Sequence, residues 1–176
     1  MNLVRSTLFG EYEPSGDINT ADAIVGQDYG FRQNDPGLVN RNLAGFIYDE
    51  LPDDITTILQ QDSAQALEEL GRSPDVITRG DPSTSTGMQL DSWEVLSRAL
   101  RAMNERGLSR PIIVGQAHQI GRLTLQAIKL GMNPIIPEGL PATFDHHSEQ
   151  FWTRNAGAWA VRESIGVPYL KLRGKL

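Results

Sequence analysis

The feature that most constrains the fold is a regular alternation of short apolar runs with longer amphipathic stretches. β-branched and other apolar residues concentrate in four runs that predict buried strands, at 21–25, 55–59, 75–78 and 111–115. The stretches that follow these runs place apolar residues at helical spacing and predict helices over 38–51, 62–70, 88–106 and 118–130. Asp62 or Ser63 is predicted to cap the second of these helices. Strands that alternate with helices are typical of a parallel sheet covered on both faces.

Two further segments complete the predicted fold. Residues 133–137 predict a short fifth strand at an edge of the sheet, because Pro134 and Pro137 are tolerated better there than at its centre. A surface loop over 139–148 leads to a last helix over 149–165. The prediction is therefore an α/β protein, a three-layer α/β/α sandwich with a mainly parallel five-stranded sheet. A chain of 176 residues has the size of one domain, here an N-terminal arm over 1–20 and a single domain over 21–176.

The amino-acid composition limits the kinds of molecule that we expect the protein to bind. Acidic residues outnumber basic ones, 22 to 16, for a formal net charge of −6, which disfavours nucleic acid because phosphate binding needs clustered Lys and Arg. No apolar segment approaches the ~20 residues of a membrane span, and the N-terminal residues lack the apolar core of a signal peptide. The chain has no cysteine. We expect a cytoplasmic protein that binds neither nucleic acid nor membrane.

Polar residues gather where the predicted strands end, and there parallel α/β proteins bind their ligands. After the first strand, Gly26, Gln27, Gly30 and Arg32 are predicted to contact a ligand, and Asp28 to bind a ribose hydroxyl or act as a base. The two glycines would let a ligand approach the backbone. Their spacing differs from the G-x-G-x-x-G fingerprint, and no Gly-Lys-Ser/Thr follows as in a P-loop, so turn glycines are the structural alternative.

The fourth strand leads into Gln116, His118 and Arg122. The last two lie four residues apart at a helix start, so they share a face where an imidazole and a guanidinium could bind an anion or transfer a proton. The structural alternative is a histidine that caps its own helix and a solvated arginine. Before the longest predicted helix, Thr86 and Gln89 are further ligand candidates, with helix capping as their alternative.

Metal and nucleophile motifs are weak. The Asp145, His146 and His147 cluster has no further ligand at a recognised zinc spacing, and no Gly-x-Ser-x-Gly elbow is present. We therefore predict no metal site. Hydrolysis that depends on a metal bound by Asp28, Asp81, His118, His146 or His147 is the least favoured alternative.

In this order the segments resemble the YdcF/SanA-like family, a bacterial group described as a domain of unknown function. The resemblance is carried by residues 21–26, 85–89, 112–122, 129–131 and 162–174, and covers about 21–174. The chain departs from the family pattern at residues 60–64, which lack the usual glycines and glutamate, and at Gln89, where asparagine is usual.

The resemblance implies a Rossmann-like fold and a small anionic or nucleotide-type ligand, with S-adenosylmethionine one candidate. The positions that match the family are Gly26, Gln27, Asp28, Thr86, Gln89, His118 and Arg122. Arg122 would pair with negative charge, backbone N–H groups after the first strand would bind the ligand, and His118 would serve as acid, base or donor. A group-transfer or hydrolytic enzyme and a non-catalytic ligand-binding or regulatory module both remain open.

Overall fold

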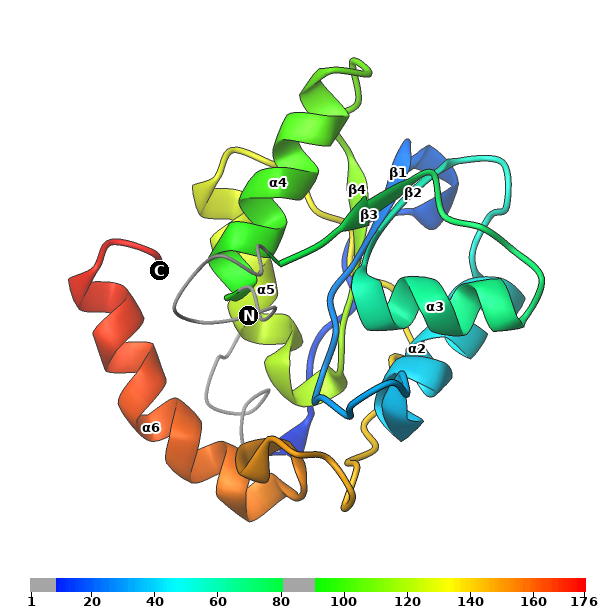
Figure 1. The fold of residues 1–176 in the computed structure, drawn as a ribbon. Coiled ribbons are helices and arrows are strands. Elements are labelled where there is room, and N and C mark those ends of the chain that lie inside the picture. The colour runs from blue at the N-terminus through cyan, green and yellow to red at the C-terminus, as the bar shows by residue number, and fades with distance from the viewer. Residues whose placement is uncertain (1–8, 81–90) are drawn as a thin grey trace.

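The protein is an α/β protein built around a parallel sheet, as predicted. The structure, a computed structural model, describes residues 9–80 and 91–176 (Figure 1). Within these residues the sheet has four strands: β1 (Ala23–Gly26), β2 (Thr56–Gln60), β3 (Val76–Thr78) and β4 (Pro111–Val114). Their spatial order is β3-β2-β1-β4 and every pair is parallel. This order matches the first four strands of the Rossmann order 3-2-1-4-5-6.

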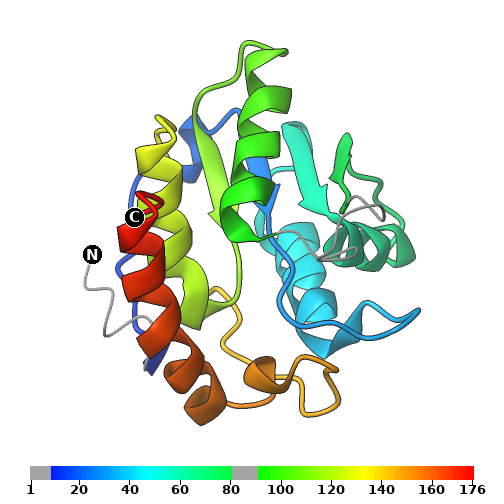
Figure 2. The same ribbon diagram turned by 60° about the vertical axis from the view of Figure 1, so that its left-hand side comes forward.

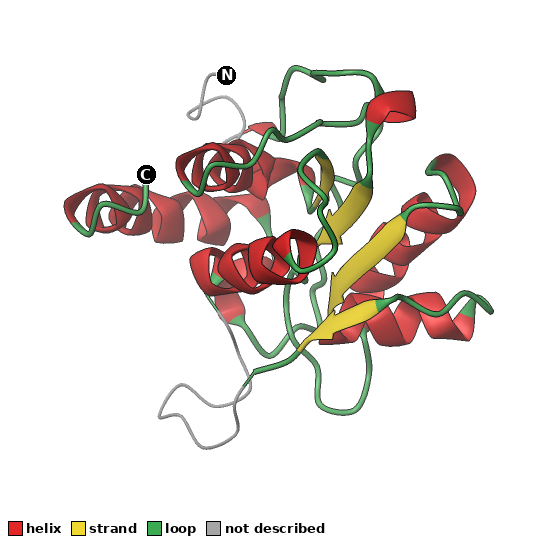
Figure 3. Cartoon of the chain, turned by 90° about the horizontal axis from the view of Figure 1, so that it is seen from above, coloured by secondary structure: helices red, strands yellow, loops and turns green. Residues whose placement is uncertain are grey.

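Helices cover both faces of the sheet. They are α2 (Gly37–Glu50), α3 (Gln61–Glu69), α4 (Ser92–Asn104), α5 (Ala117–Lys129) and α6 (Ala156–Leu172), with 3-10 turns η1 (Ile18–Thr20) and η2 (Phe151–Thr153). Figures 1 and 3 show α2 and α3 on one face and α4 and α5 on the other. Figure 2 shows α6 along the outer side of α5, away from the sheet.

The core lies between these layers. All four residues of β1 are buried, because β1 is flanked by β2 and β4 and covered on both faces. A strand in this position must be apolar throughout, and its sequence Ala-Ile-Val-Gly meets that demand. Side chains from the neighbouring strands, such as Leu59 and Ile113, are completely buried beside it.

The predicted fifth strand is wrong. Ile135 makes a parallel bridge to Ile112 of β4, and Ile136 makes an antiparallel bridge to Ser15 of the arm, but neither bridge extends into a ladder. Pro134 and Pro137 flank this dipeptide, and proline has no backbone N–H to donate to a neighbouring strand. The pattern correctly indicated an edge of the sheet, yet two residues are too few for a strand.

Two helix boundaries also differ from the sequence prediction. The last helix begins at Ala156, seven residues later than predicted and after η2, because the side chain of Asn155 accepts a hydrogen bond from the backbone N–H of Ala158 (2.9 Å). It then continues past Gly166 and Pro168 to Leu172. The long helix before β4 begins at Ser92, where the Asp91 carboxylate caps Glu94 N–H (2.8 Å).

The described part of the arm lies against the edge of the sheet. Tyr12 packs on the core, and its hydroxyl accepts a hydrogen bond from Leu140 N–H (2.7 Å). Among the described residues, no helix combines the length and the apolar character needed to cross a bilayer.

Candidate ligand-binding cavity

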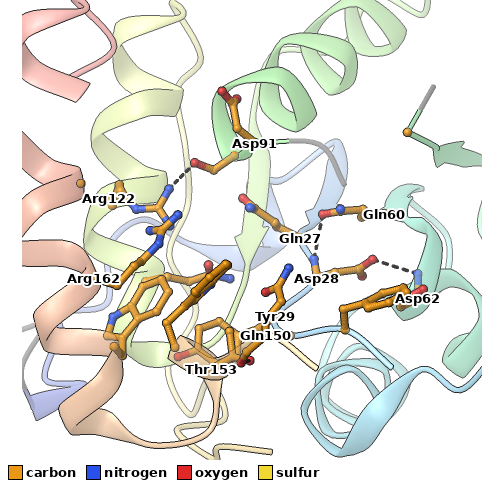
Figure 4. Close-up of a pocket in the computed structure, with 18 of the residues that line it drawn as sticks. Gln27, Asp28, Tyr29, Gln60, Asp62, Asp91, Arg122, Gln150, Thr153 and Arg162 are labelled. Carbon is orange, nitrogen blue, oxygen red and sulfur yellow. Dashed lines mark hydrogen bonds between the residues drawn. The ribbon is translucent and has the colours of Figure 1, made fainter. Parts of the chain in front are cut away.

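A cavity of about 470 Å³ opens at the carboxyl ends of the strands (Figure 4). Its walls come from the segments after β1, β2 and β3, from the start of α4, and from α5, η2 and α6. A volume of this size suits a small organic ligand. Its position is the one predicted from the polar strand ends.

One wall of the cavity is acidic. Asp28 follows β1, and its two carboxylate oxygens accept hydrogen bonds from the backbone N–H groups of Asp62 (2.9 Å) and Ser63 (2.8 Å) at the start of α3. Burial raises the pKa of Asp28, against these hydrogen bonds. Burial and the nearby Asp28 carboxylate raise the pKa of Asp62 to about 7. Near neutral pH this wall therefore carries a variable negative charge.

The opposite wall carries two arginines. Arg122 of α5 is 4% exposed, and its Nε donates to the Glu163 carboxylate (3.1 Å) while Nη1 donates to Ser92 Oγ. Arg162, which is half-buried on α6, also pairs with Glu163. Both guanidinium groups lie near the Trp159 ring, at 5.8 and 5.1 Å from its centroid. Figure 4 shows these arginines facing Asp28 and Asp62 across the cavity, with Gln27 between.

Neutral hydrogen-bonding groups and aromatic rings fill the space between the charged walls. The amide side chains that line the cavity are Gln27, Gln60, Gln61, Gln119 and Gln150. Three buried polar atoms of the lining residues have no hydrogen-bond partner in the described part of the chain: Gln27 Oε1, Tyr29 Oη and Gln119 Nε2. Buried polar groups normally find a partner, so these atoms are available to a ligand or to water. The indole of Trp152 adds a partly exposed aromatic surface.

The structure brings four of the predicted site residues into the cavity: Gln27, Asp28, Gly30 and Arg122. Gly30 has φ of +87°, and a side chain there would meet Ser148 Oγ at 3.1 Å, so the position requires glycine. Asp28 caps α3 from a distant loop, and the sequence had predicted that Asp62 or Ser63 would cap this helix from within.

His118 does not line the cavity. Its ring packs edge-on against Phe144 (centroids 4.7 Å apart), and the Cα of Gly10 lies close enough that an added Cβ would be 2.9 Å from the ring. Burial lowers the pKa of His118, which favours the neutral imidazole. The residue lies one helical turn before Arg122, about 6 Å along the axis, so the two share a helix face without reaching the same cavity.

Three other predicted ligand contacts have structural roles outside the cavity. Gly26 lies so close to Leu59 that an added Cβ would be 2.5 Å from Leu59 Cδ2. Arg32 forms an ion pair with the buried Asp145, its Nε donating at 2.8 Å. Gln116 caps α5, with Oε1 accepting the His118 N–H at 2.7 Å.

The backbone after β1 is also less available than predicted. The N–H groups of four residues already donate within the protein, those of Gln27, Asp28, Tyr29 and Phe31. Their acceptors belong to β4, β2, α2 and the loop that precedes η2. The segment therefore presents mainly side chains to the cavity, and its backbone N–H groups hold the neighbouring elements together.

Some predicted residues lie outside the described part of the chain, namely Thr86, Gln89 and the metal candidate Asp81. His146 and His147 are exposed in the loop before η2. In the ranges 9–80 and 91–176 no group of three or more His, Cys, Asp or Glu side chains is arranged to hold a metal ion.

Sequence reasoning missed the contribution of α6. Trp159 and Arg162 lie in a segment predicted only as a last helix, and they line the cavity, while Glu163 pairs with Arg122 and Arg162. A signal was present, since a glutamate beside an arginine interrupts an otherwise apolar helix.

Fold and cavity together define an α/β protein with a parallel sheet and a cavity of about 470 Å³ at the carboxyl edge of that sheet. Comparison with protein-family models, with curated proteins and with solved structures found no match to the chain.

Proposed function

We propose that the cavity binds a small anionic or nucleotide-type ligand, with S-adenosylmethionine one candidate, and that the protein is a cytoplasmic member of the YdcF/SanA-like group. The observation that carries the ligand proposal is the separation of charge across the cavity, with Asp28 and Asp62 on one wall and Arg122 and Arg162 on the other. Carboxylates bind ribose hydroxyl groups in dinucleotide-binding folds, and guanidinium groups bind oxoanions. A nucleoside 5′-phosphate carries ribose hydroxyl groups and an oxoanion on different sides of the same sugar.

The rest of the lining supports this orientation. Side-chain amides between the two walls can donate to and accept from a sugar or a base edge. Trp152 provides aromatic surface for a planar ring, whereas Trp159 is buried behind the arginines and fixed by its indole N–H, which donates to the His118 carbonyl oxygen (3.3 Å). A ligand that spans the cavity would thus place its hydroxyl groups near α3 and its anionic group between α5 and α6.

If the protein is an enzyme of group transfer or hydrolysis, Asp62 is the residue best suited to act as acid or base. Its pKa of about 7 leaves both protonation states populated near neutral pH, as general acid–base catalysis requires. Asp28 is less suited, because both of its oxygens already bind backbone N–H groups.

A non-catalytic ligand-binding or regulatory module is the second candidate. The observation that favours it is the position of His118, which is packed under Phe144 and Gly10 and does not face the cavity. The Asp62→Asn variant separates the two candidates. A loss of turnover much larger than the loss of affinity would indicate an enzyme.

Calorimetric titration of adenosine, adenosine 5′-monophosphate and S-adenosylmethionine at pH 8 tests the proposed function. Asp62→Asn should weaken binding of all three by about tenfold, the effect of losing a hydrogen bond to a charged group. Asp54→Asn is the matched control, because Asp54 is exposed and outside the cavity. Failure of all three compounds to bind the wild-type protein at millimolar concentration, or equal weakening by both variants, would contradict the proposal.

A further inference from the structure

The helix N-termini around the cavity are closed by side chains of the protein itself. A carboxylate or an amide accepts backbone N–H groups in the first turn of each helix: Asp28 at α3, Asp91 at α4 and Gln116 at α5. Helix N-termini are common phosphate sites, since their free N–H groups and the helix dipole favour anions. Here carboxylates already occupy two of the three positions, Asp28 at α3 and Asp91, which is also paired with Lys175, at α4.

A second anion site in such folds is the backbone after the first strand, and this one is also occupied. The N–H groups of Gln27, Asp28, Tyr29 and Phe31 donate within the protein. A chain of two or three phosphates needs several such donors along its length. The described part of the cavity therefore lacks the backbone cradle that holds polyphosphates in other parallel α/β proteins.

Side chains at the other end of the cavity supply a different anion site. We call it the oxoanion corner, formed by Tyr29, Gln119, Arg122 and Arg162. These residues come from the segment after β1, from α5 and from α6. Three of them are at least nine-tenths buried, at 3% exposed for Tyr29, 2% for Gln119 and 4% for Arg122.

Charge and hydrogen-bonding capacity limit what this corner can bind. The guanidinium groups of Arg122 and Arg162 both pair with the Glu163 carboxylate. These three side chains together carry a net charge of +1. The Tyr29 hydroxyl and the Gln119 amide nitrogen are buried donors without a partner among the described residues. Burial raises the pKa of Tyr29, so its hydroxyl stays a donor. An oxoanion group beside the two arginines would use the surplus charge, and a small shift of the buried side chains would bring it the two donors.

We infer that the oxoanion corner selects a ligand with a single terminal oxoanion, a phosphoryl monoester or a carboxylate, over di- and triphosphates. The inference rests on the proposed function, because it concerns one end of the same ligand. Additional phosphate groups would extend from the corner toward Asp28 and Asp62, where like charges oppose them.

The test compares four probes by calorimetry in metal-free buffer: adenosine, adenosine 5′-monophosphate, adenosine 5′-triphosphate and S-adenosylmethionine. Adenosine 5′-monophosphate should bind at least about fivefold more tightly than the triphosphate, because the extra phosphate groups of the triphosphate would meet at least one carboxylate of like charge. Arg162→Gln should weaken the monophosphate or S-adenosylmethionine by about tenfold and leave adenosine unchanged. Arg101→Gln, an exposed arginine on α4 outside the cavity, should change none of the affinities.

Tyr29→Phe is a second variant that keeps every charge, and it should weaken the oxoanion ligands by about fivefold without affecting adenosine. If the two variants weaken only the binding of the monophosphate, the corner is a phosphoryl site. If they weaken only the binding of S-adenosylmethionine, it is a carboxylate site. Triphosphate binding as tight as monophosphate binding, or equal weakening of adenosine by Arg162→Gln, would overturn the inference and leave the proposed function standing. Absence of binding by every probe would instead overturn the proposed function.

Discussion

At the scale of single residues, the carboxylates of the cavity combine structural and chemical roles. Asp28 caps α3 from a position 34 residues away in the sequence, which is why local patterns pointed to Asp62 and Ser63 as caps. The Asp62 side chain is therefore not needed to cap α3. It lies in the cavity with its carboxyl group beside that of Asp28, and the free energy of this like-charge contact depends on pH.

Asp62 should make the free energy of unfolding depend on pH. The pKa of Asp62 is about 7 in the folded protein, whereas an unfolded aspartate titrates near 3.9. Between about pH 4 and pH 7 the folded state holds a proton that the unfolded chain has lost, so this group makes the free energy of unfolding fall as pH rises. Asp62→Asn, which resembles the protonated form, should raise the melting temperature by several degrees at pH 8.

The gain should shrink steadily as pH is lowered toward about 4, below which aspartate becomes protonated in the unfolded state as well as in the folded state. Melting curves of wild type and variant between pH 4 and pH 8 measure it. Asp54→Asn, at an exposed position, should show no such trend. A gain that does not vary with pH would mean that Asp62 titrates normally.

At the scale of secondary-structure elements, one buried ion pair joins α6 to α5. Arg122 is 4% exposed and Glu163 is 2% exposed, and both are separated from bulk water. Burial lowers the pKa of Arg122, against the attraction of Glu163. Removing one partner of a buried pair leaves the other charge unpaired in a poorly solvating environment.

Glu163→Gln should therefore lower the free energy of unfolding by about 3 kcal/mol, as measured by urea denaturation. Glu94→Gln breaks an exposed ion pair with Arg98 and should cost about 0.5 kcal/mol or less. The double variant Arg122→Met, Glu163→Leu replaces the pair with apolar side chains and should recover most of the loss, because the other partner of Glu163, Arg162, is 39% exposed and can be solvated by water. If the double variant is less stable than Glu163→Gln, the arginine contributes mainly through its contacts with Ser92 and Trp159.

Elements were easier to predict than the site. The strand predictions 55–59 and 111–115 differ from β2 and β4 by one residue at their ends, because buried parallel strands must be continuously apolar. The cavity wall on α6 was missed, since contacts such as Arg122 with Glu163 join residues 41 positions apart and leave no local periodicity. His118 was misplaced for a related reason, because helical spacing fixes a face but not which neighbouring segment covers it.

At the scale of the whole molecule, the arm completes the edge of the sheet that the predicted fifth strand was expected to form. Ser15 and Ile136 exchange two backbone hydrogen bonds (2.9 and 2.8 Å), while Ile135 is bonded to β4 on its other side. Two short segments distant in sequence thus replace one regular strand. Their contact also holds Gly10 near the His118 ring and the Tyr12 hydroxyl at Leu140.

Gly16→Ala should detach the arm from this edge. Gly16 has φ of +81°, and an added Cβ would lie 2.9 Å from Ile135 Cγ1, so alanine meets both backbone strain and a steric clash. Gly71→Ala is the matched control, because Gly71 has φ of +92° and no atom within 4 Å of an added Cβ. Left-handed alanine costs about 1 kcal/mol at either position, and the clash should add at least about 1 kcal/mol at Gly16 alone. Hydrogen exchange at the Ile136 amide, which donates to Ser15, should accelerate only in Gly16→Ala. Equal losses of stability and unchanged exchange at Ile136 would mean that the edge is held by the segment around Ile135 without help from the arm.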